Sequence, residues 1–402
     1  MTTFSDTSAA QLAYIEESVY GTTPASGNGK YLRMTGESLG FDYTMETSKE
    51  INSTAQVPDA VVVDTTAGGG INIELSYREY DPFIEALLRS TFDTYGTGGI
   101  STLTVTIDKT AGTITDDGTD GFTGLDVGQY FYMAGTAASG ANDGLYRVGA
   151  NTNDVITVDA STPLAADETS TASVTFSSTR IATGTAALRS FSIEKSLTDV
   201  TQFFLNKGRV PSKWDLSFAP GQLLTGMFDF LGSTQARAGA TGLPGTTAAA
   251  QSYGIMNCVS GVANIFVRNS GGTSLLDGAS ILNMNLSIDG ALRGQKALGV
   301  LGNAGVGRGT FAITGTMNIY FAAGSLFDEA LAQNLIELSF TASDSSGNGY
   351  GFTMPNVKCS VPKVNAGAKD QDCIMEVPFF AVAPDTATDK MIYIDRFGAA
   401  IV

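Results

Sequence analysis

The side chains that could carry out chemistry in this sequence are carboxylates, lysines, tyrosines and serines, because none of its 402 residues is histidine. That absence removes the Ser/His/Asp and Cys/His nucleophile arrangements and the commonest ligand of transition metals. Acidic pairs such as Glu16 with Glu17 or Asp370 with Asp372 could act as the acid and the base of glycoside hydrolysis. No sugar-binding aromatic groove is indicated beside them, so we interpret both pairs as solvated surface and assign no catalytic residue.

Two glycine-containing segments could bind ions. Residues 116–121, Asp-Asp-Gly-Thr-Asp-Gly, offer calcium-type oxygen ligands, but their spacing differs from an EF-hand and the bidentate Glu is missing. Four glycines crowd residues 302–309, yet this segment leads into a predicted strand, and no Gly-Lys-Ser/Thr sequence follows it. We interpret the first as a turn and the second as an assembly loop, and we expect no metal and no cofactor.

Cysteine usage and charge restrict the class of protein further. Cys258, Cys359 and Cys373 are odd in number and far apart, which argues against a disulfide framework and favours buried, reduced thiols. The net charge of −17 favours a surface that repels nucleic-acid backbones and anionic lipids. No apolar run approaches the ~20 residues that span a bilayer, and no basic residue precedes position 20 as a secretory signal would require. We therefore expect a soluble protein, made in the cytoplasm, with no membrane partner.

One unit recurs three times in the sequence: a strand of alternating apolar residues, a turn and a short amphipathic helix. These strands and helices are the elements that must position any functional site. The pairs are predicted at 71–77 and 83–88, at 214–218 and 223–231, and at 317–321 and 326–331. Asp81 is the predicted N-cap of the first helix with Pro82 at its first position, and Ser325 is the predicted N-cap of the third. Gly232 is predicted to close the second helix.

The first and third units share what precedes them, namely an alternating strand at 39–45 or 282–288 and a long glycine-containing loop. This self-similarity indicates a duplicated β domain. The expected fold is mainly β with short helices: two copies of a β sandwich or barrel, each with a flanking helix, plus an inserted small all-β domain. The predicted boundaries are 1–96 with 180–235 for the first copy, 97–179 for the insertion and 236–402 for the second copy.

The insertion, Thr97 to Thr179, has a different sequence pattern from the rest of the chain. Short β-type runs at 103–107, 129–133, 145–148, 155–158 and 174–176 are separated by Gly, Asn and Asp turns, with no helix signal. We predict an independently folded small barrel or sandwich, placed in a loop where its two ends lie close together.

Several stretches resemble the tail tube proteins of long-tailed bacteriophages. The opening Leu-Ala-Tyr-Ile-Glu-Glu-Ser-Val-Tyr-Gly-Thr-Thr-Pro at 12–24 is similar to that family's start, and 32–39 and 71–83 are similar to later parts of it. So are the C-terminal stretches 354–358, 370–372 and 377–381, while 127–130 and 142–148 resemble β modules that such proteins carry on the tube exterior. The match excludes the rest of the insertion.

The resemblance implies a structural, self-assembling virion protein. Its subunits would form rings whose inner strands join into a β-lined channel, the rings would stack through long loops, and double-stranded DNA would pass down the channel without specific binding. Two tube domains per chain imply a trimeric ring with pseudo-sixfold symmetry; a hexameric ring is the alternative. The implied partners are further copies of the chain, the tape measure protein, and the tail terminator and distal tail proteins.

Alternation supplies the candidate channel residues, because polar side chains opposite the core-facing Ile73, Leu216 and Met317 share one sheet face. Whether that face is channel or outer solvent stays open at this point. The candidates are Asn72, Glu74, Asp215, Ser217, Thr316 and Asn318. The loops 46–66 and 289–308 are the candidate ring-stacking segments, with Glu46, Lys49, Asp59, Asp64, Arg293, Lys296 and Arg308 as their charged residues. The alternatives from other classes are a secreted or surface β-rich adhesin or binding module and a carboxylate-based hydrolase.

Overall fold

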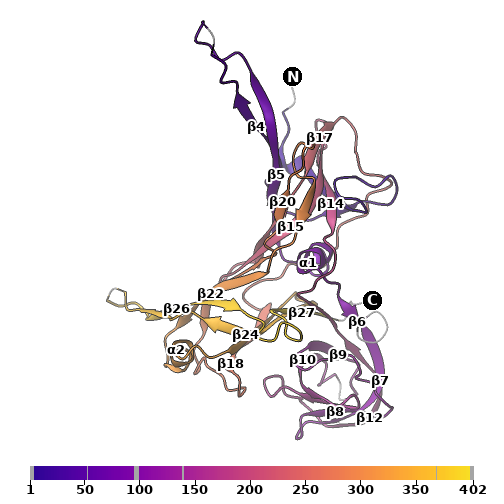
Figure 1. Cartoon of the computed structure of the whole chain (residues 1–402). Helices are drawn as coiled ribbons and strands as arrows, with labels where there is room; N and C mark the ends of the chain where they lie inside the picture. Colours follow the sequence, from indigo (N-terminus) through magenta and orange to yellow (C-terminus); the bar gives the residue numbers. More distant parts are fainter. Residues whose placement is uncertain (1–3, 52, 95–98, 138–139, 368, 399–402) are drawn as a thin grey trace.

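The computed structural model describes residues 4–51, 53–94, 99–137, 140–367 and 369–398, and it is mainly β with two short α-helices in that part of the chain. Figure 1 shows a two-stranded arm rising from the body at the top, a second hairpin projecting to the side, and a small barrel at the bottom. The predicted domain boundary at 96/97 lies outside the described residues. The fold class predicted from the sequence is confirmed.

The N-terminal half contributes thirteen elements outside the barrel. They are η1 (Thr7–Ala9), β1 (Ala10–Glu17), β2 (Lys30–Leu32), β3 (Gly36–Glu37), β4 (Gly40–Thr47), β5 (Ala60–Glu74), α1 (Asp81–Leu88), β6 (Asp93–Thr94), β13 (Thr179–Ala182), β14 (Ser190–Leu197), β15 (Gln202–Phe218), β16 (Thr225–Leu231) and β17 (Thr234–Ala238).

The C-terminal half follows after a connection without strands. Its elements are β18 (Val262–Asn269), β19 (Ile281–Asp289), β20 (Arg293–Gln295), β21 (Gly305–Gly307), β22 (Ala312–Tyr320), α2 (Ser325–Leu331), β23 (Ile336–Ser343), β24 (Gly349–Cys359), β25 (Lys363–Asn365), β26 (Ile374–Ala381) and β27 (Tyr393–Phe397).

The two halves repeat one ladder of antiparallel strands. In the N-terminal half the order is β4-β5-β16-β15-β14-β1, and in the C-terminal half it is β19-β22-β26-β24-β23-β18. In both halves the helix comes directly after the strand that is second in this ladder order, α1 after β5 and α2 after β22. Equal ladder order with equal helix placement confirms the predicted duplication of one β domain with a flanking helix.

One ladder joins the halves into a continuous sheet. The last part of β15 pairs with β16 on one side and with β19 on the other, so that Trp214 lies opposite Ile288 and Leu216 opposite Leu286. The sheet therefore runs β5-β16-β15-β19-β22-β26, and its strands cross the centre of the molecule in Figure 1.

The hydrophobic core lies behind this sheet. Helix α1 packs against β15 and β13, and the Phe83 ring lies 4.9 Å from Tyr14, 5.0 Å from Phe191 and 5.8 Å from Phe228, measured between ring centroids. These aromatic rings come from both layers, so the helix fills the space between the main sheet and the β1–β14 layer. Trp214 stacks on Phe228 at 5.1 Å within the same core.

The inserted segment forms a closed six-stranded barrel in the order β10-β11-β8-β7-β12-β9. Its strands are β7 (Ile100–Asp108), β8 (Thr113–Asp116), β9 (Tyr130–Ala134), β10 (Gly144–Asn151), β11 (Val155–Val158) and β12 (Glu168–Ser177). Five of the six correspond to predicted runs, and β8 was not predicted. Thr94 pairs with Thr179 in the ladder between β6 and β13, so the two ends of the insertion lie side by side.

The predicted second helix at 223–231 is wrong. Residues Thr225–Leu231 form strand β16, which pairs with β15 and β5 on its two sides. Leu224, Phe228 and Phe230 are buried, and the spacing of the first two fits both a helical turn and every second position of a strand. Pairing on both sides decided between the two periods, as tertiary context commonly does for short apolar runs.

The helix starts and the long loops also differ in detail. Asp81 and Ser325 are the first helical residues and not the N-caps, which are Tyr80 and Gly324. Asp81 instead accepts a 2.5 Å hydrogen bond from the Tyr350 hydroxyl, so the core holds its carboxylate. The predicted loop 46–66 is mostly a two-stranded arm of β4 and β5, and 289–308 contains the β20–β21 hairpin, because both carry enough β-branched or pairable residues to extend the ladders.

The cysteines depart from the prediction in part. All three are free thiols, but only Cys359 is buried; Cys258 is half-buried and Cys373 is exposed. Cys373 precedes β26 in the projecting hairpin, where little chain is available to cover it.

Candidate channel wall

The continuous sheet buries one of its faces. From strand to strand, Ile71, Phe228, Trp214, Ile288 and Ile313 lie opposite one another, and each is at most 1% exposed. Cross-strand partners share a face, so this row defines the core side.

The opposite face is polar and crosses both halves of the chain. One row of cross-strand partners is Glu74, Thr225, Ser217, Asn285, Thr316 and Pro378. The next row is Asn72, Met227, Asp215, Ser287, Thr314 and Phe380, and Asn318 lies opposite Asn283 beyond the first. We call this face the polar wall. All six predicted channel residues lie on it, on strands β5, β15 and β22, and three strands separate β5 from β22.

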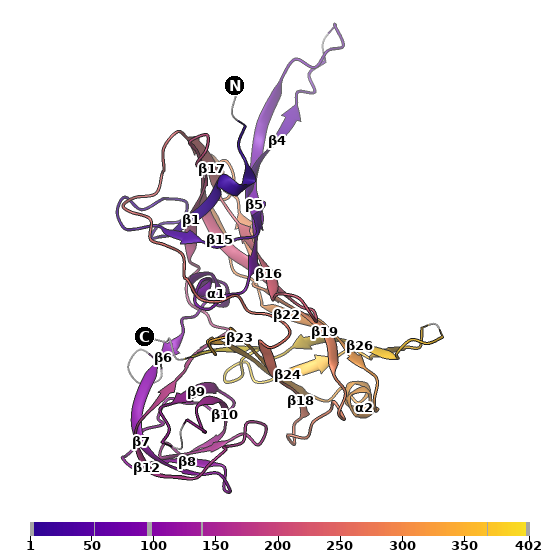
Figure 2. The same cartoon turned by 180° about the vertical axis from the view of Figure 1, so that it is seen from behind.

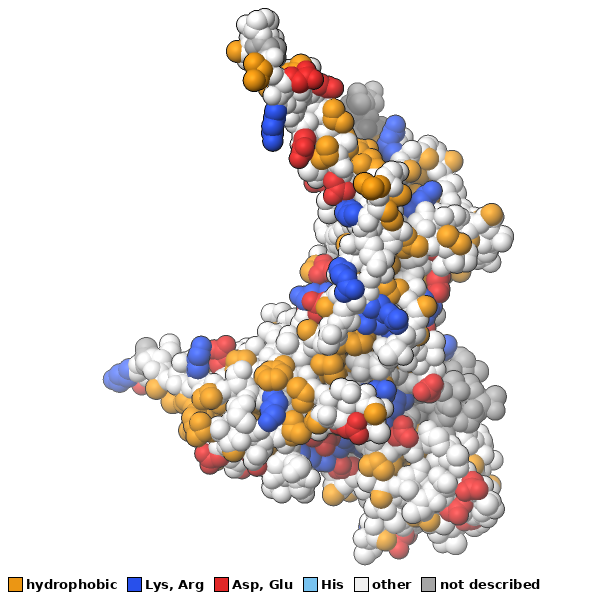
Figure 3. Space-filling model, viewed as in Figure 1, with side chains coloured by type: hydrophobic (Ala, Val, Ile, Leu, Met, Phe, Trp, Pro, Cys, Tyr) orange, Lys and Arg blue, Asp and Glu red, His pale blue; other side chains and the backbone are white. Residues whose placement is uncertain are grey.

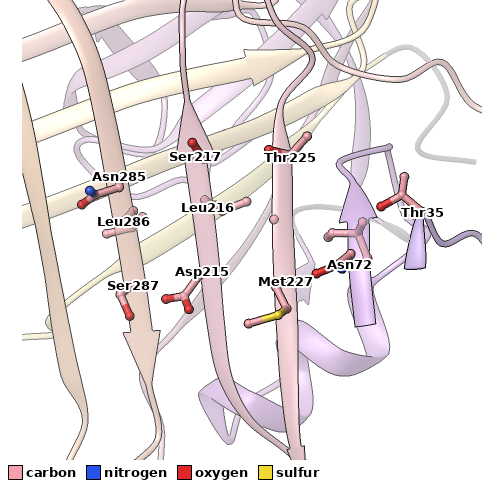
Figure 4. A pocket seen from close by; sticks show the side chains of 12 residues that line it. Thr35, Asn72, Asp215, Leu216, Ser217, Thr225, Met227, Asn285, Leu286 and Ser287 are labelled. Carbon is pink, nitrogen blue, oxygen red and sulfur yellow. The ribbon is translucent and has the colours of Figure 1, made fainter. Parts of the chain in front are cut away.

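The polar wall is hollowed along its middle. A shallow depression of about 600 Å³ runs over β5, β16, β15 and β19, and Figure 4 shows Asn72, Asp215, Ser217, Asn285 and Ser287 at its surface. The strands under it come from both halves, so the depression follows the junction between them. The depression is shallow and lined mostly by small polar side chains, whereas sites for small ligands are enclosed and mostly apolar.

Carboxylates outnumber cations in the part of the polar wall around Lys213. Lys213 forms a 2.7 Å ion pair with Asp215, and it lies opposite Asp229 and Asp289 on the neighbouring strands. Partial burial, and then the charge of Asp215, raise the pKa of Asp229 above its ordinary value. One lysine among three carboxylates leaves this area electronegative, and such a surface repels phosphate.

Sequence reasoning missed several residues of the polar wall. Thr225 and Met227 were assigned to the false helix, and Asn285 and Ser287 alternate with Leu286 in a strand whose polar side was not considered. The alternation around Leu286 was the signal that could have identified the last two.

The predicted ring-stacking residues lie in two separate environments. Glu46, Lys49 and Asp59 are on the distal part of the β4–β5 arm. Arg293 and Arg308 flank the β20–β21 hairpin, where Arg293 donates to the Arg308 carbonyl at 2.9 Å. Lys296 forms a 2.7 Å ion pair with Asp64, which ties that hairpin to the base of the arm.

The arm carries apolar side chains that the chain itself leaves uncovered. Figure 3 shows orange side chains along it, at the top of the view. The exposed residues are Tyr43, Met45, Ile51, Val57, Val61 and Val63, and Ile51 is fully exposed. An exposed apolar ribbon of this kind is a candidate surface for contact with another chain.

The barrel is docked on the C-terminal half by buried polar contacts, and Figure 2 shows it from behind, below β23 and β24. Tyr130 is fully buried, its hydroxyl lies 3.2 Å from that of Ser339, and its ring lies against Gly351. Asp159 pairs with Arg268 at 2.6 Å across the same contact. The barrel is therefore inserted into one half and bound to the other.

Residues 116–121 form a turn that closes on itself, since Asp116 accepts from the Gly121 backbone at 3.2 Å. Within the described ranges, no three His, Cys, Asp or Glu side chains gather as a metal site would require, and no helix is long and apolar enough to cross a bilayer.

A continuous sheet with one polar face and with edges that pair with no other strand in the described residues is the architecture of a β protein that can add strands at its edges. The model of the phage tail tube protein family matches residues 7–381, so the chain belongs to that family and is a structural component of the virion tail that self-associates into a tube. No curated protein matches the chain.

Proposed function

We propose that this chain is the major tail tube subunit of a long-tailed phage, and that three chains close into a ring with pseudo-sixfold symmetry. The observation that supports this most is the repeated ladder. It gives each chain two equivalent four-strand contributions to one sheet, β4-β5-β16-β15 and β19-β22-β26-β24. Under this proposal the tube domains are 1–96 with 180–235 and 236–402, and 97–179 is an outer domain. A six-chain ring is the alternative.

In the proposed tube the polar wall faces the channel, and the genome passes along it. Its electronegative area would keep DNA from adhering, since phosphate binding depends on positive side chains. The apolar arm and the β20–β21 hairpin would contact the next ring, where burial of Met45, Ile51 and Val57 stabilises stacking by about 25 cal/mol per Å² of apolar surface. The chain would act without catalysis, and the tape measure, tail terminator and distal tail proteins would be its other partners.

Cryo-EM of purified tails or of polymers grown from the isolated chain tests this proposal. The expected result is a hollow tube of stacked rings, three chains per ring, with Asn72, Asp215 and Thr316 at the inner surface. Strict sixfold symmetry with a whole chain in each sixth would overturn the trimer, and a core-facing or outer position for those three residues would overturn the channel assignment.

A further inference from the structure

The continuous sheet ends in two edges that pair with no strand in the described part of the chain. One edge is formed by β3 and the start of β4, which pair only with β5. The other is formed by the end of β24 together with β25, which pair with β26 on one side. Unpaired edges of a sheet are sites for adding another strand.

The pairing of β15 with β19, which joins the two halves inside the chain, shows which strand can pair with such an edge. On one side of β15, strand β14 pairs up to Arg209, and β19 then continues from Lys213 to Phe218. On the equivalent side of β24, strand β23 pairs up to Val357, and no strand in the described ranges follows it along Lys358–Lys363. The C-terminal half therefore has a counterpart of the β14–β15 pairing, namely β23–β24, but no counterpart of the β15–β19 pairing within the described residues.

The repeat also identifies the missing strand. Aligning the starts of α1 and α2 places Asn72 with Thr316 and Gly68 with Ala312. Gly68 pairs with Gly40, as Ala312 pairs with Asp289. The counterpart of β19 is therefore the segment 35–40 of the N-terminal half, which is the other free edge.

We propose that residues 358–363 of one chain pair, antiparallel, with residues 35–40 of a second copy, with Lys358 opposite Gly40. This inference rests on the proposed ring and specifies its contact between chains. The register follows from the internal junction, where Lys213, the counterpart of Lys358, lies opposite Asp289.

The surfaces beside the two edges fit each other. A groove of about 820 Å³ lies next to β3 and is lined by Leu12, Tyr31 and Met34 among others. Val361 on the opposite edge is 51% exposed and needs apolar cover. At the internal junction the counterpart of Val361 is Leu216, which lies opposite Leu286 on β19 and is only 2% exposed.

Charge favours the same pairing. The edge at 358–363 carries Lys358 and Lys363, whereas the receiving edge is followed by Asp42. Glu37 on that edge is already paired with Lys195 of its own chain at 2.8 Å, so Asp42 is the carboxylate that remains for a lysine of the second chain. Opposite charges at the rim of a contact accelerate association and suppress wrong partners.

Disulfide trapping in assembled tubes tests the pairing. In a chain with Cys258→Ser and Cys373→Ser, Lys358→Cys is combined in separate variants with Gly36→Cys, Ser38→Cys or Gly40→Cys, all on the polar side of the receiving edge. Opposite residues of an antiparallel pair have Cα atoms about 4.5–5.5 Å apart, within the range of a disulfide. The matched control is Lys358→Cys with Ser217→Cys, since Ser217 is exposed on the same face but belongs to an inner strand.

The expected result is covalent chains up to the trimer, at least tenfold more abundant than in the control, with Gly40→Cys the most efficient partner. Crosslinking that is strongest at Gly36→Cys or Ser38→Cys would support the edge pairing and overturn the register. Tubes that form normally but crosslink at none of the three positions would overturn the inference and leave the proposed function standing. Failure of the unmodified chain to form tubes would count against the proposed function itself.

Discussion

The backbone N–H of Tyr130 donates a 2.9 Å hydrogen bond to Oδ2 of Asp395, joining the inserted barrel to the last strand of the chain. The same carboxylate accepts from Arg180 at 2.6 and 2.9 Å, next to the point where the insertion returns. One buried aspartate thus connects the barrel, its exit strand and the C-terminal half.

Tyr130→Ala should loosen the docked barrel. Removing this buried ring leaves a cavity against Gly351, and large-to-small changes of this kind cost about 3 kcal/mol. Hydrogen exchange at β24 and β27 should show that the free energy of local opening falls by that amount. Tyr130→Phe should lower it by only about 1 kcal/mol. Val127→Ala, at an exposed barrel position, is the control, and equal opening in Tyr130→Ala and this control would contradict the assignment.

Acid should weaken the ion pair between Asp159 of the barrel and Arg268 of the C-terminal half. Burial alone would raise the pKa of Asp159, but hydrogen bonds from Arg268 and Ser161 outweigh it and hold the pKa well below its ordinary value. A carboxyl with a lowered pKa stabilises the folded state fully above its unfolded pKa of about 3.9 and loses that contribution as the pH falls further. The stability difference between the wild type and Asp159→Asn should therefore be constant from pH 7 to about 5 and shrink below 4, measured by denaturation. A difference that grows on acidification would refute this.

Replacing the barrel by a short Gly/Ser linker should leave tube formation intact. Thr94 and Thr179 are ladder partners, so a short turn closes the gap without moving β6 or β13. The shortened chain should be less stable, because the surface around Gly351 and Ser339 loses its cover. Electron microscopy checks for tubes; a folded, soluble chain that never polymerises would show that the barrel takes part in assembly.

Arg209 should anchor the arm. It is fully buried and donates to the Gly68 and Gly40 carbonyls at 2.8 and 2.9 Å, while burial lowers its pKa to about 10. Arg209→Met leaves both carbonyls without this donor and should cost about 3 kcal/mol, with the earliest loss of hydrogen-exchange protection at the base of β4. Arg237→Met, at an exposed position of β17, should cost less than 0.5 kcal/mol; similar losses in the two variants would be evidence against an anchoring role.

Reversing the charge of the polar wall should slow genome passage. Glu74→Lys and Asp215→Lys change half-buried positions, and the second change also breaks the Lys213–Asp215 ion pair, so stability should fall by about 1 kcal/mol. Repeated rings of lysine would attract phosphate in a salt-dependent manner. Phage carrying both changes should eject DNA more slowly than wild type at low salt and less so at high salt. Asp167→Lys on the barrel is the control, and an unaltered ejection rate in the double variant would place these residues elsewhere.

The strands were predictable wherever apolar and polar residues alternate over a segment long enough to fit a strand and not a helix. Ile71, Ile73 and Leu75 indicated both β5 and its polar face, and the register between strands then placed all six candidate residues together. The segment around Phe228 failed because a seven-residue apolar pattern satisfies two periods, and only the neighbours β5 and β15 decide between them. Contacts such as Tyr130 with Asp395 join residues too distant in sequence for any local pattern to indicate.

The covalent connection of two equivalent β units has a kinetic consequence. In the proposed ring of three chains, the nucleation rate would rise with about the third power of chain concentration, whereas a ring of six separate units would require about the sixth power. Within the chain, the connection between β17 and β18 holds the second unit at an effective concentration of order millimolar. Nucleation should therefore remain possible early in infection, when free subunits are still scarce.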